Sequence, residues 1–214
     1  MVNPPLSPLE QRVLGSLIEK DMTTPDYYPL SVNSLMTACN QKTNREPTTD
    51  YDEDTVRDGL GALEERDLAE PRYDSRVPKY AHRASYTLNL NNRELAVICV
   101  LLLRGPQTLN ELKDRTQRMY AFDDLDAVEN SLRKLSEREV PLTVFLGRQP
   151  GQREPRWMHL MGGPVSAERL AESAAVSTHR AARTEDLEIR LNTLEAELHQ
   201  LKEQFAAFRR QFES

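Results

Sequence analysis

Hydrophobic and polar positions along this chain repeat in a way that marks a duplicated helix. The segment 54–68 (DTVRDGLGALEERDL) returns 72 residues later as 126–140 (DAVENSLRKLSEREV). In each copy three apolar residues are spaced by four and then three positions, which places them on one face of a helix. The equivalent pairs are Val56 and Val128, Leu60 and Leu132, and Leu63 and Leu135. Because internal repeats set the architecture of a chain, this echo predicts two related units.

The first unit predicts three helices, and the clearest signals lie at their N-termini. Ser7 and Glu10 form a capping box, Ser31 caps the second helix, and the acidic residues 52–54 suit the positive end of the third helix dipole. The helices are expected to run from Ser7 to near Asp21, from Ser31 to near Asn40 and from Asp52 to Leu68. After Leu68 the apolar period changes to two.

The change of period predicts a hairpin at the end of the first unit. We expect a short strand at 68–73, a tip at 74–78 and a half-buried strand at 80–88. Pro71 favours an edge position for the first of these strands, because proline cannot donate to a sheet ladder. On the second strand the apolar face would consist of Tyr80, Ala84, Tyr86 and Leu88.

The second unit repeats the same order. Asn91 and Glu94 open a helix that is apolar almost all round as far as Leu103, a pattern typical of a helix buried on most sides. Thr108 and Glu111 form a further capping box. A third helix at 123–139 and strands at 142–146 and 156–160 complete the unit. The predicted core of both units includes Leu14, Leu17, Leu35, Tyr86, Ile98, Leu102, Leu112 and Trp157.

The C-terminal segment carries a heptad pattern, with spacings of four and three. Its members are Leu187, Leu191, Leu194, Leu198, Leu201, Phe205, Phe208 and Phe212. A lone helix would leave this apolar seam in water, so the seam must pack on something. The pattern predicts a parallel coiled-coil homodimer, and the alternative is a helix that folds back on its own domains. The expected organisation is a first domain at 1–90, a second at 91–163, a linker at 164–183 and a coiled-coil helix at 184–214.

Composition and charge are those of a soluble cytoplasmic protein. Charged residues make up 29% of the chain and the net charge is −6, so the overall balance does not indicate a nucleic-acid-binding protein. The charge is uneven, because residues 1–90 carry 10 basic and 15 acidic side chains whereas residues 91–163 carry 11 and 10. No basic and then apolar leader opens the chain, and the longest apolar run, 95–103, is too short to span a membrane.

Three helices followed by a two-stranded hairpin is the order of a winged-helix domain. The chain resembles the YceH-like family of uncharacterised bacterial proteins in the segments YPLSVNSLMTACNQKTNREP (28–47), SRVPKYAHR (75–83), RGPQTLNELKDR (104–115) and LGRQPGQRE (146–154). The resemblance covers about residues 7–162. It implies an α+β, mainly helical fold of two tandem winged-helix domains. The family brings no activity, and the winged-helix fold favours DNA binding only by analogy.

Basic residues gather at both predicted hairpins. They are Arg72, Arg76, Lys79 and Arg83, with His82, in the first, and Arg148, Arg153 and Arg156 in the second. One interpretation is contact with DNA phosphates or the minor groove. The other is a charged, solvated edge that keeps the strands from aggregating. Both interpretations remain open from the sequence.

The turn before the third helix supplies three further candidates, Lys42, Asn44 and Arg45. In a helix-turn-helix arrangement this turn approaches the DNA backbone, and Asn and Arg are suitable donors. The alternative is structural, in which Asn44 caps a turn and Arg45 pairs with a neighbouring acid.

The third helices argue against major-groove binding. Residues 52–67 contain seven acids against two arginines, and residues 123–139 contain six acids against three basic residues. A helix that lies beside phosphates should not be this acidic. If DNA is bound, we therefore expect the hairpins and the turn before the third helix to make the main contacts.

The sequence contains no pattern typical of an enzyme. There is no nucleophile–base pair, no phosphate-cradling glycine loop and no metal-ligand spacing, so no cofactor or metal is expected. Cys39 and Cys99 lie in apolar helical contexts and are predicted to be buried thiols. Two hypotheses remain. The chain is either a DNA-associated cytoplasmic protein that acts through its hairpins, or a tandem winged-helix adaptor that binds another protein.

Overall fold

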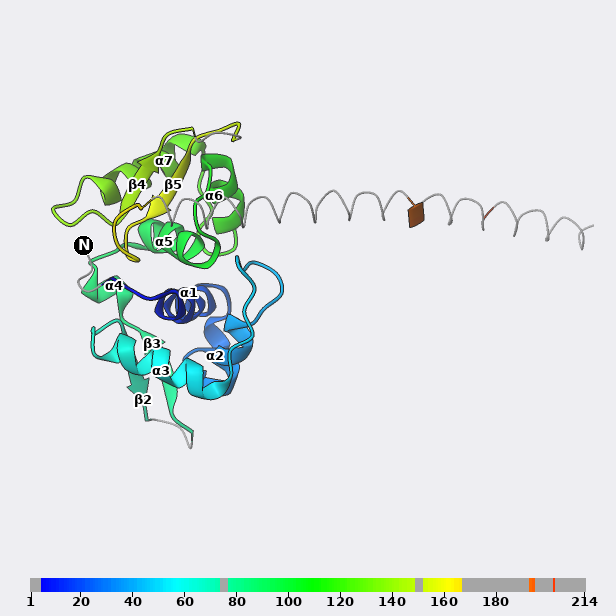
Figure 1. The fold of residues 1–214 in the computed structure, drawn as a ribbon, viewed down its shortest axis with the longest axis vertical. Coiled ribbons are helices and arrows are strands. Elements are labelled where there is room, and N and C mark those ends of the chain that lie inside the picture. Colours follow the sequence, from blue (N-terminus) through cyan, green and yellow to red (C-terminus); the bar gives the residue numbers. More distant parts are fainter. Residues whose placement is uncertain (1–4, 74–76, 149–151, 167–192, 195–201, 203–214) are drawn as a thin grey trace, which may run out of the picture. The chain divides into compact units, whose positions relative to one another are not determined.

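The computed structural model describes residues 5–73, 77–148 and 152–166, together with 193, 194 and 202. Residues up to Val165 form one compact unit, in which the described residues contain seven α-helices and two small sheets (Figure 1). The first half contains α1 (Pro8–Thr23), the short 3-10 helix η1 (Pro25–Tyr27), β1 (Leu30–Ser31), α2 (Val32–Cys39), α3 (Glu53–Glu64), β2 (Ala69–Arg72), β3 (Lys79–His82) and α4 (Ala84–Thr87). The second half contains α5 (Asn92–Arg104), α6 (Leu109–Thr116), α7 (Leu125–Ser136), β4 (Thr143–Leu146) and β5 (Arg156–His159).

The helices begin where their capping residues predict. The Ser7 hydroxyl accepts from the Glu10 amide at 3.3 Å, and the Glu10 carboxylate accepts from the Ser7 amide at 2.7 Å. Thr108 and Glu111 make the same reciprocal pair at the start of α6, at 3.2 and 3.0 Å. Each box satisfies two amides that would otherwise have no partner at a helix N-terminus.

The repeated segment forms a helix in both copies, α3 and α7, as predicted, but α3 ends at Glu64 and α7 at Ser136, before the C-terminal ends of the predicted ranges. The three apolar pairs of the repeat are all buried, from Val56 and Val128 to Leu63 and Leu135. The two halves also share a β-pairing just before their second helix, which the sequence pattern does not show. β1 comes just before α2 and pairs with β3, and Gln107, just before α6, forms a bridge with Trp157 of β5. The two halves therefore share one order of helices followed by an antiparallel hairpin, and an isolated bridge at Gln107 stands in the second half where the first half has β1.

The first sheet has the strand order β1-β3-β2, with β3 in the middle and both pairings antiparallel. Pro71 lies on β2, which is an edge strand, as its missing amide hydrogen predicts. The second sheet is the pair β4–β5, with Thr143 opposite His159 and Leu146 opposite Arg156.

The strand predicted at 80–88 is wrong beyond His82. Residues 84–87 instead form the single-turn helix α4, and Tyr86, a predicted core residue, is 78% exposed. Ala84 and Leu88 face the core in the structure. Residues four positions apart lie on the same face both in a strand, which has a period of two, and in a helix turn, so these two residues fit either element. Tyr86 distinguishes a strand from a helix turn, because a strand would place it on the same face as Ala84 and Leu88, whereas the helix places it in solvent. The other predicted core residues are buried.

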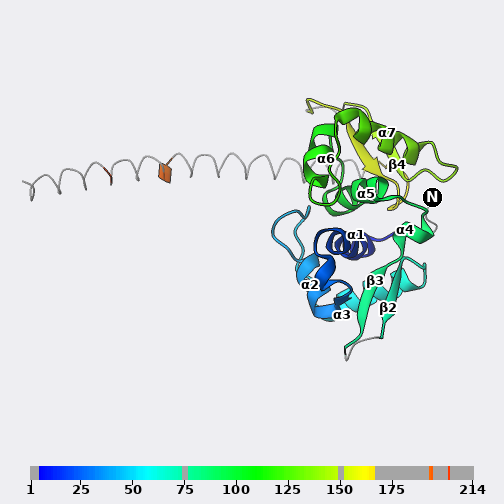
Figure 2. The ribbon, with the colours of Figure 1, turned by 180° about the vertical axis from the view of Figure 1, so that it is seen from behind.

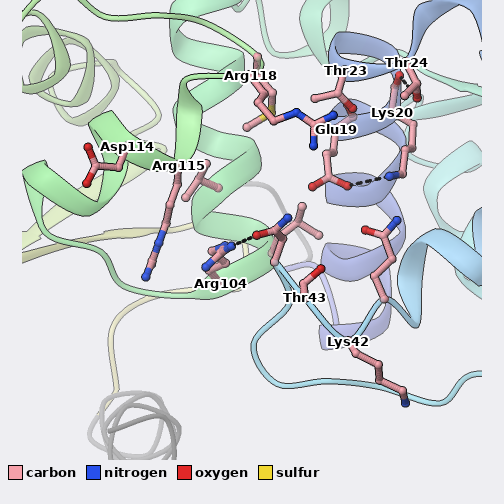
Figure 3. Close-up of a pocket in the computed structure, with 15 residues that line it drawn as sticks. Glu19, Lys20, Thr23, Thr24, Lys42, Thr43, Arg104, Asp114, Arg115 and Arg118 are labelled. Carbon is pink, nitrogen blue, oxygen red and sulfur yellow. Dashed lines mark hydrogen bonds and ion pairs between the residues drawn. The ribbon is translucent and has the colours of Figure 1, made fainter. Parts of the chain in front are cut away.

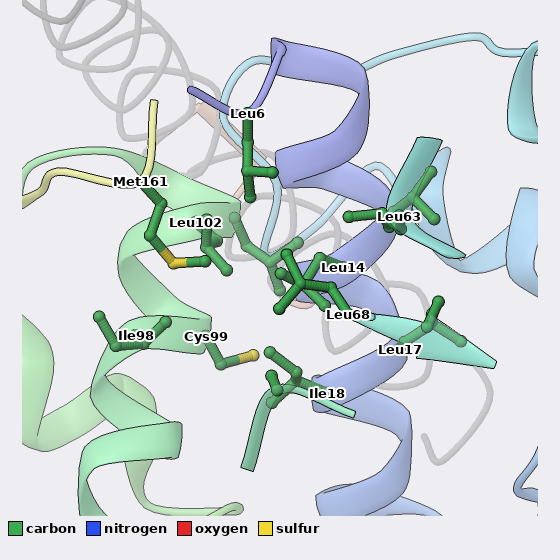
Figure 4. Close-up of a cluster of buried hydrophobic side chains, with 14 of the residues drawn as sticks. Leu6, Leu14, Leu17, Ile18, Leu63, Leu68, Ile98, Cys99, Leu102 and Met161 are labelled. Atoms are coloured by element: carbon green, nitrogen blue, oxygen red, sulfur yellow. The ribbon is translucent and has the colours of Figure 1, made fainter. Parts of the chain in front are cut away.

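α5 joins the two halves because its two faces enter different cores. Ile98, Cys99 and Leu102 pack with Leu14, Leu17 and Ile18 of α1 (Figure 4). The opposite face, including Val97 and Leu101, packs with α6, α7 and Trp157. This explains why the helix is apolar all round.

Gly15 lies in the contact between α1 and α5, where it leaves no space for a side chain. A Cβ atom added to Gly15 would lie 2.8 Å from Cδ2 of Leu103 and 3.2 Å from Cβ of Leu102. The Cys99 thiol also donates to the Gly15 carbonyl at 3.3 Å. A second link comes from the segment before α1, where the Leu6 amide donates to the Met161 carbonyl at 2.8 Å. Both halves of residues 5–165 therefore contribute side chains to the first of these two cores.

The predicted coiled coil lies almost wholly outside the described residues. Of its eight seam residues only Leu194 is described, and it is 62% exposed. Elsewhere in the described ranges, no helix is both long and apolar enough to cross a bilayer.

Candidate functional site

Two arginines of the first hairpin, Arg72 and Arg83, form ion pairs with neighbouring acids. Arg83 pairs with Glu70 at 2.7 Å and with Asp67 at 2.8 Å, and Arg72 also pairs with Glu70. The His82 side chain is buried, and its Nε2 lies 3.2 Å from a carboxylate oxygen of Asp21. Ion pairing within the protein reduces the positive potential that these arginines present to a phosphate.

Lys79 is the exception on this hairpin, because it is partly exposed and no described residue forms an ion pair with it. Arg76 lies outside the described residues. Of the predicted basic cluster, the two described arginines, Arg72 and Arg83, therefore pair with carboxylates, and Lys79 does not.

The second hairpin presents more available positive charge. Arg148 and Arg153 are both exposed. Arg156 instead turns back to the domain, where it donates to Glu111 at 2.5 Å and to the Pro106 carbonyl at 3.0 Å. Burial acts to raise the pKa of the Glu111 carboxyl, but the Thr108 amide, Arg115 and Arg156 outweigh burial and lower it.

Arg45, in the loop before α3, is buried and structural. Its guanidinium donates to Glu19 of α1 at 3.1 and 2.5 Å and to the Ala38 carbonyl at 3.0 Å. This placement favours pairing with an acid over contact with DNA. Asn44 has a positive φ of 62° and accepts from Arg104, which favours a structural role in the turn for this residue as well. Lys42 is exposed.

A second buried arginine, Arg12, donates hydrogen bonds to the same loop. It was not identified from the sequence. It is 4% exposed and donates to the carbonyls of Cys39 at 3.1 Å and Pro47 at 2.5 Å. Burial, and then the neighbouring charge of Arg45, lowers the pKa of Arg12. The available signal was that Arg12, Ser16 and Glu19 follow helical spacing on α1. That spacing does not say whether the face is buried.

The exposed face of α3 is strongly acidic. Asp54, Asp58, Glu64 and Glu65 all lie on it. The arginine of this face, Arg57, pairs with Glu53 at 3.4 Å within the same helix. The exposed face of α7 is mixed, with Arg133 and Lys134 among its acids. The two third helices therefore present different electrostatic surfaces although their buried faces are equivalent.

The two hairpins do not combine into one basic surface. In both views the hairpin β2–β3 and the hairpin β4–β5 lie at opposite ends of the unit formed by residues up to Val165 (Figure 1 and Figure 2). A straight duplex cannot contact both through one continuous positive face.

The described residues contain no group of three His, Cys, Asp or Glu side chains placed to hold a metal ion. Cys39 and Cys99 are both buried free thiols, as predicted. Burial raises the pKa of both thiols, so they resist the ionisation that a metal ligand or nucleophile needs.

Comparison with known proteins shows the family. The family model described as "Protein of unknown function, DUF480" matches residues 6–152. A UPF0502 protein of Solibacter usitatus is 46% identical over 209 residues, covering 97% of this chain and 98% of that protein. UPF0502 proteins of Hahella chejuensis (48% over 202 residues; 90% and 92% covered) and Vibrio atlanticus (43% over 220; 100% and 99%) are also similar. The chain belongs to this DUF480 family, and its predicted membership of the YceH-like bacterial proteins is confirmed.

Proposed function

We propose that this chain is a cytoplasmic, non-enzymatic tandem winged-helix adaptor that binds a basic protein partner through the exposed face of α3. Support for two winged-helix domains, at 1–90 and 91–163, comes from the order of three helices and a hairpin in each half, with β1 in the first half and a bridge at Gln107 in the second pairing with the hairpin. Because a fold does not define a function, the adaptor role rests on surface charge.

The acidic face of α3 is the observation that carries the proposal. Asp54 and Asp58 are exposed one helical turn apart, and Glu65 continues the same face. The two described arginines of the hairpin β2–β3, Arg72 and Arg83, are paired with Glu70 and Asp67. A positively charged protein surface is attracted to this arrangement, whereas DNA phosphates are repelled by it.

Capture of partners from native lysate tests the adaptor role. With the full chain as bait, we expect Asp54→Lys combined with Asp58→Lys to reduce recovery of the specific partner about tenfold or more, because charge reversal places like charges in contact. Both positions are exposed, but Asp54 lies in the first turn of α3, where a lysine opposes the helix dipole, so circular dichroism must first show that the double variant is folded. The matched control is Glu129→Lys on the exposed face of α7. Equal recovery by all three baits would contradict binding at α3.

A second candidate, nucleic-acid association through the second half, is favoured by the exposed Arg148 and Arg153. Nuclease treatment of the same lysate separates the two functions. Recovery through α3 is expected to survive nuclease. The second candidate predicts partners that are lost on nuclease treatment. The same partners should also be lost with a bait that carries both Arg148→Gln and Arg153→Gln, because these arginines would contact phosphates of any sequence.

We also propose that residues 184–212 form a parallel coiled-coil homodimer, which would present two copies of the α3 face. The support is the uninterrupted heptad spacing of the segment. Sedimentation of the full chain should give a dimer, and a chain that ends at Gly163 should give a monomer. A monomer in both cases would contradict the coiled coil, and a dimer in both would place the interface in the folded domains.

A further inference from the structure

A pocket of about 530 Å³ opens between the two halves (Figure 3). Its walls come from the last turns of α1, the loop 41–44, the end of α5 and the end of α6 with the residues that follow it. Small-molecule sites in proteins typically have volumes of roughly 300–1,000 Å³. The pocket therefore has the size of a ligand site, and both halves contribute to it.

Cationic side chains dominate the charged lining. They are Lys20, Lys42, Arg104, Arg115 and Arg118, against the two acids Glu19 and Asp114. Glu19 is already neutralised, because Arg45 pairs with it at 2.5 Å from the protein interior and Lys20 at 3.5 Å. Arg115 is also paired, with Glu111 at 3.4 Å. The surplus of positive charge in the lining therefore comes from Lys42, Arg104 and Arg118.

Helix dipoles explain only part of this surplus. Lys20, Arg104 and Arg115 lie in the last turns of α1, α5 and α6, where a cation stabilises the negative end of the dipole. Lys42 and Arg118 lie outside these helices, and both are exposed. Within the described ranges, neither of the two forms an ion pair. Their charge has no structural counterpart and is available to a ligand.

The side chains are arranged for an anion with an apolar portion. Arg118 reaches from the segment after α6 toward Glu19 and Thr23 of α1 (Figure 3). Val100, Leu103 and Met119 supply apolar lining next to it. Lys42 extends outward from its loop, a position suited to attracting an anion from solution.

We propose that this pocket binds a phosphorylated small molecule, with Arg118 as the principal phosphate contact and Arg104 supporting it. Guanidinium groups hold phosphate through paired, charge-assisted hydrogen bonds, which a lysine cannot reproduce. Because the ligand would contact both halves, its binding would also stabilise the folded chain.

A calorimetric titration of the full chain with inorganic pyrophosphate, at constant ionic strength, tests the proposal. We expect saturable binding and a rise in the midpoint of thermal unfolding. Arg118→Gln should raise the Kd about tenfold, because one charge-assisted contact is lost. The unfolding midpoint of this variant without ligand should equal that of the wild type, since Arg118 has no ion-pair partner among the described residues.

The matched control is Arg133→Gln, which removes an exposed arginine on α7 away from the pocket lining. An unchanged Kd for this control, together with weakened binding by Arg118→Gln, supports the site. Equal weakening by both variants would show only general attraction to surface charge and would overturn the proposal. Failure of the wild-type chain to bind pyrophosphate saturably would overturn it as well.

Discussion

Arg45→Met is expected to lower the free energy of unfolding by about 3 kcal/mol, because it removes the buried partner of Glu19 and leaves that carboxylate only its contact with Lys20 at 3.5 Å. The Arg45 side chain is fully buried and the Glu19 side chain is 12% exposed, with 2.5 Å between Nη2 and Oε2. The same guanidinium satisfies the Ala38 carbonyl, which would also lose its donor. Urea unfolding followed by circular dichroism measures the loss.

The control for this variant is Arg57→Met, which breaks an exposed pair within α3. The side chains of Arg57 and Glu53 are 54% and 45% exposed, so the expected cost is about 0.5 kcal/mol or less. A cost for Arg45→Met as small as that of the control would mean that the buried pair does not stabilise the fold.

Acidification provides a second readout of the same pair. Burial acts to raise the pKa of the Glu19 carboxyl, but hydrogen bonding and attraction from Arg45 outweigh it, and the folded-state pKa lies below the ordinary value of 4.5. A carboxylate with a lowered pKa stabilises the fold above its unfolded pKa, and this contribution is lost as the pH falls through the folded pKa. The stability difference between the wild type and Glu19→Gln should therefore be greatest near neutral pH and shrink below about pH 4.5.

Gly15→Val is expected to destabilise the chain by about 3 kcal/mol, because it forces extra atoms into a close-packed helix contact. Even the first added carbon would lie 2.8 Å from Cδ2 of Leu103 and 3.2 Å from Cβ of Leu102, and the Cβ of Leu102 can move away only together with the backbone of α5. Thermal or urea unfolding measures the effect.

Gly61→Val is the matched control, since Gly61 is also a helix glycine but has no atom within 4 Å of an added Cβ. Valine has a somewhat better helix propensity than glycine, so this variant should be neutral or slightly more stable. If both valine variants behave alike, the α1–α5 contact is looser than the structure indicates.

Local sequence signals predicted the elements of the fold well. Capping residues such as Ser7 and Thr108 act on amides only three residues away, so their effect is visible in the sequence. The repeated helices were visible for the same reason. Tyr86 was assigned wrongly because its neighbours Ala84 and Leu88 fit a strand and a helix turn equally well, and the fold made the choice.

The candidate site was predicted less well, because its chemistry depends on pairs that are distant in sequence. Arg45 meets Glu19 across 26 residues, and Arg83 meets Glu70 across 13, so composition alone showed a basic turn and a basic hairpin. The acidity of α3 was visible in the sequence because an exposed helix face depends only on spacing. The pocket between the halves was not visible, since it arises from the packing of α1 against α5.

Hydrogen exchange under native conditions tests most directly the central claim that the two halves share one core. Both the pocket and the placement of the hairpins depend on the contact between α1 and α5. In the wild type, the slowest amides of α1 and α5 should exchange with the same free energy of opening, which equals that of global unfolding. Gly15→Val should lower protection in both helices by the same amount. Loss of protection in α1 alone, with α5, α6 and α7 unchanged, would contradict a shared core.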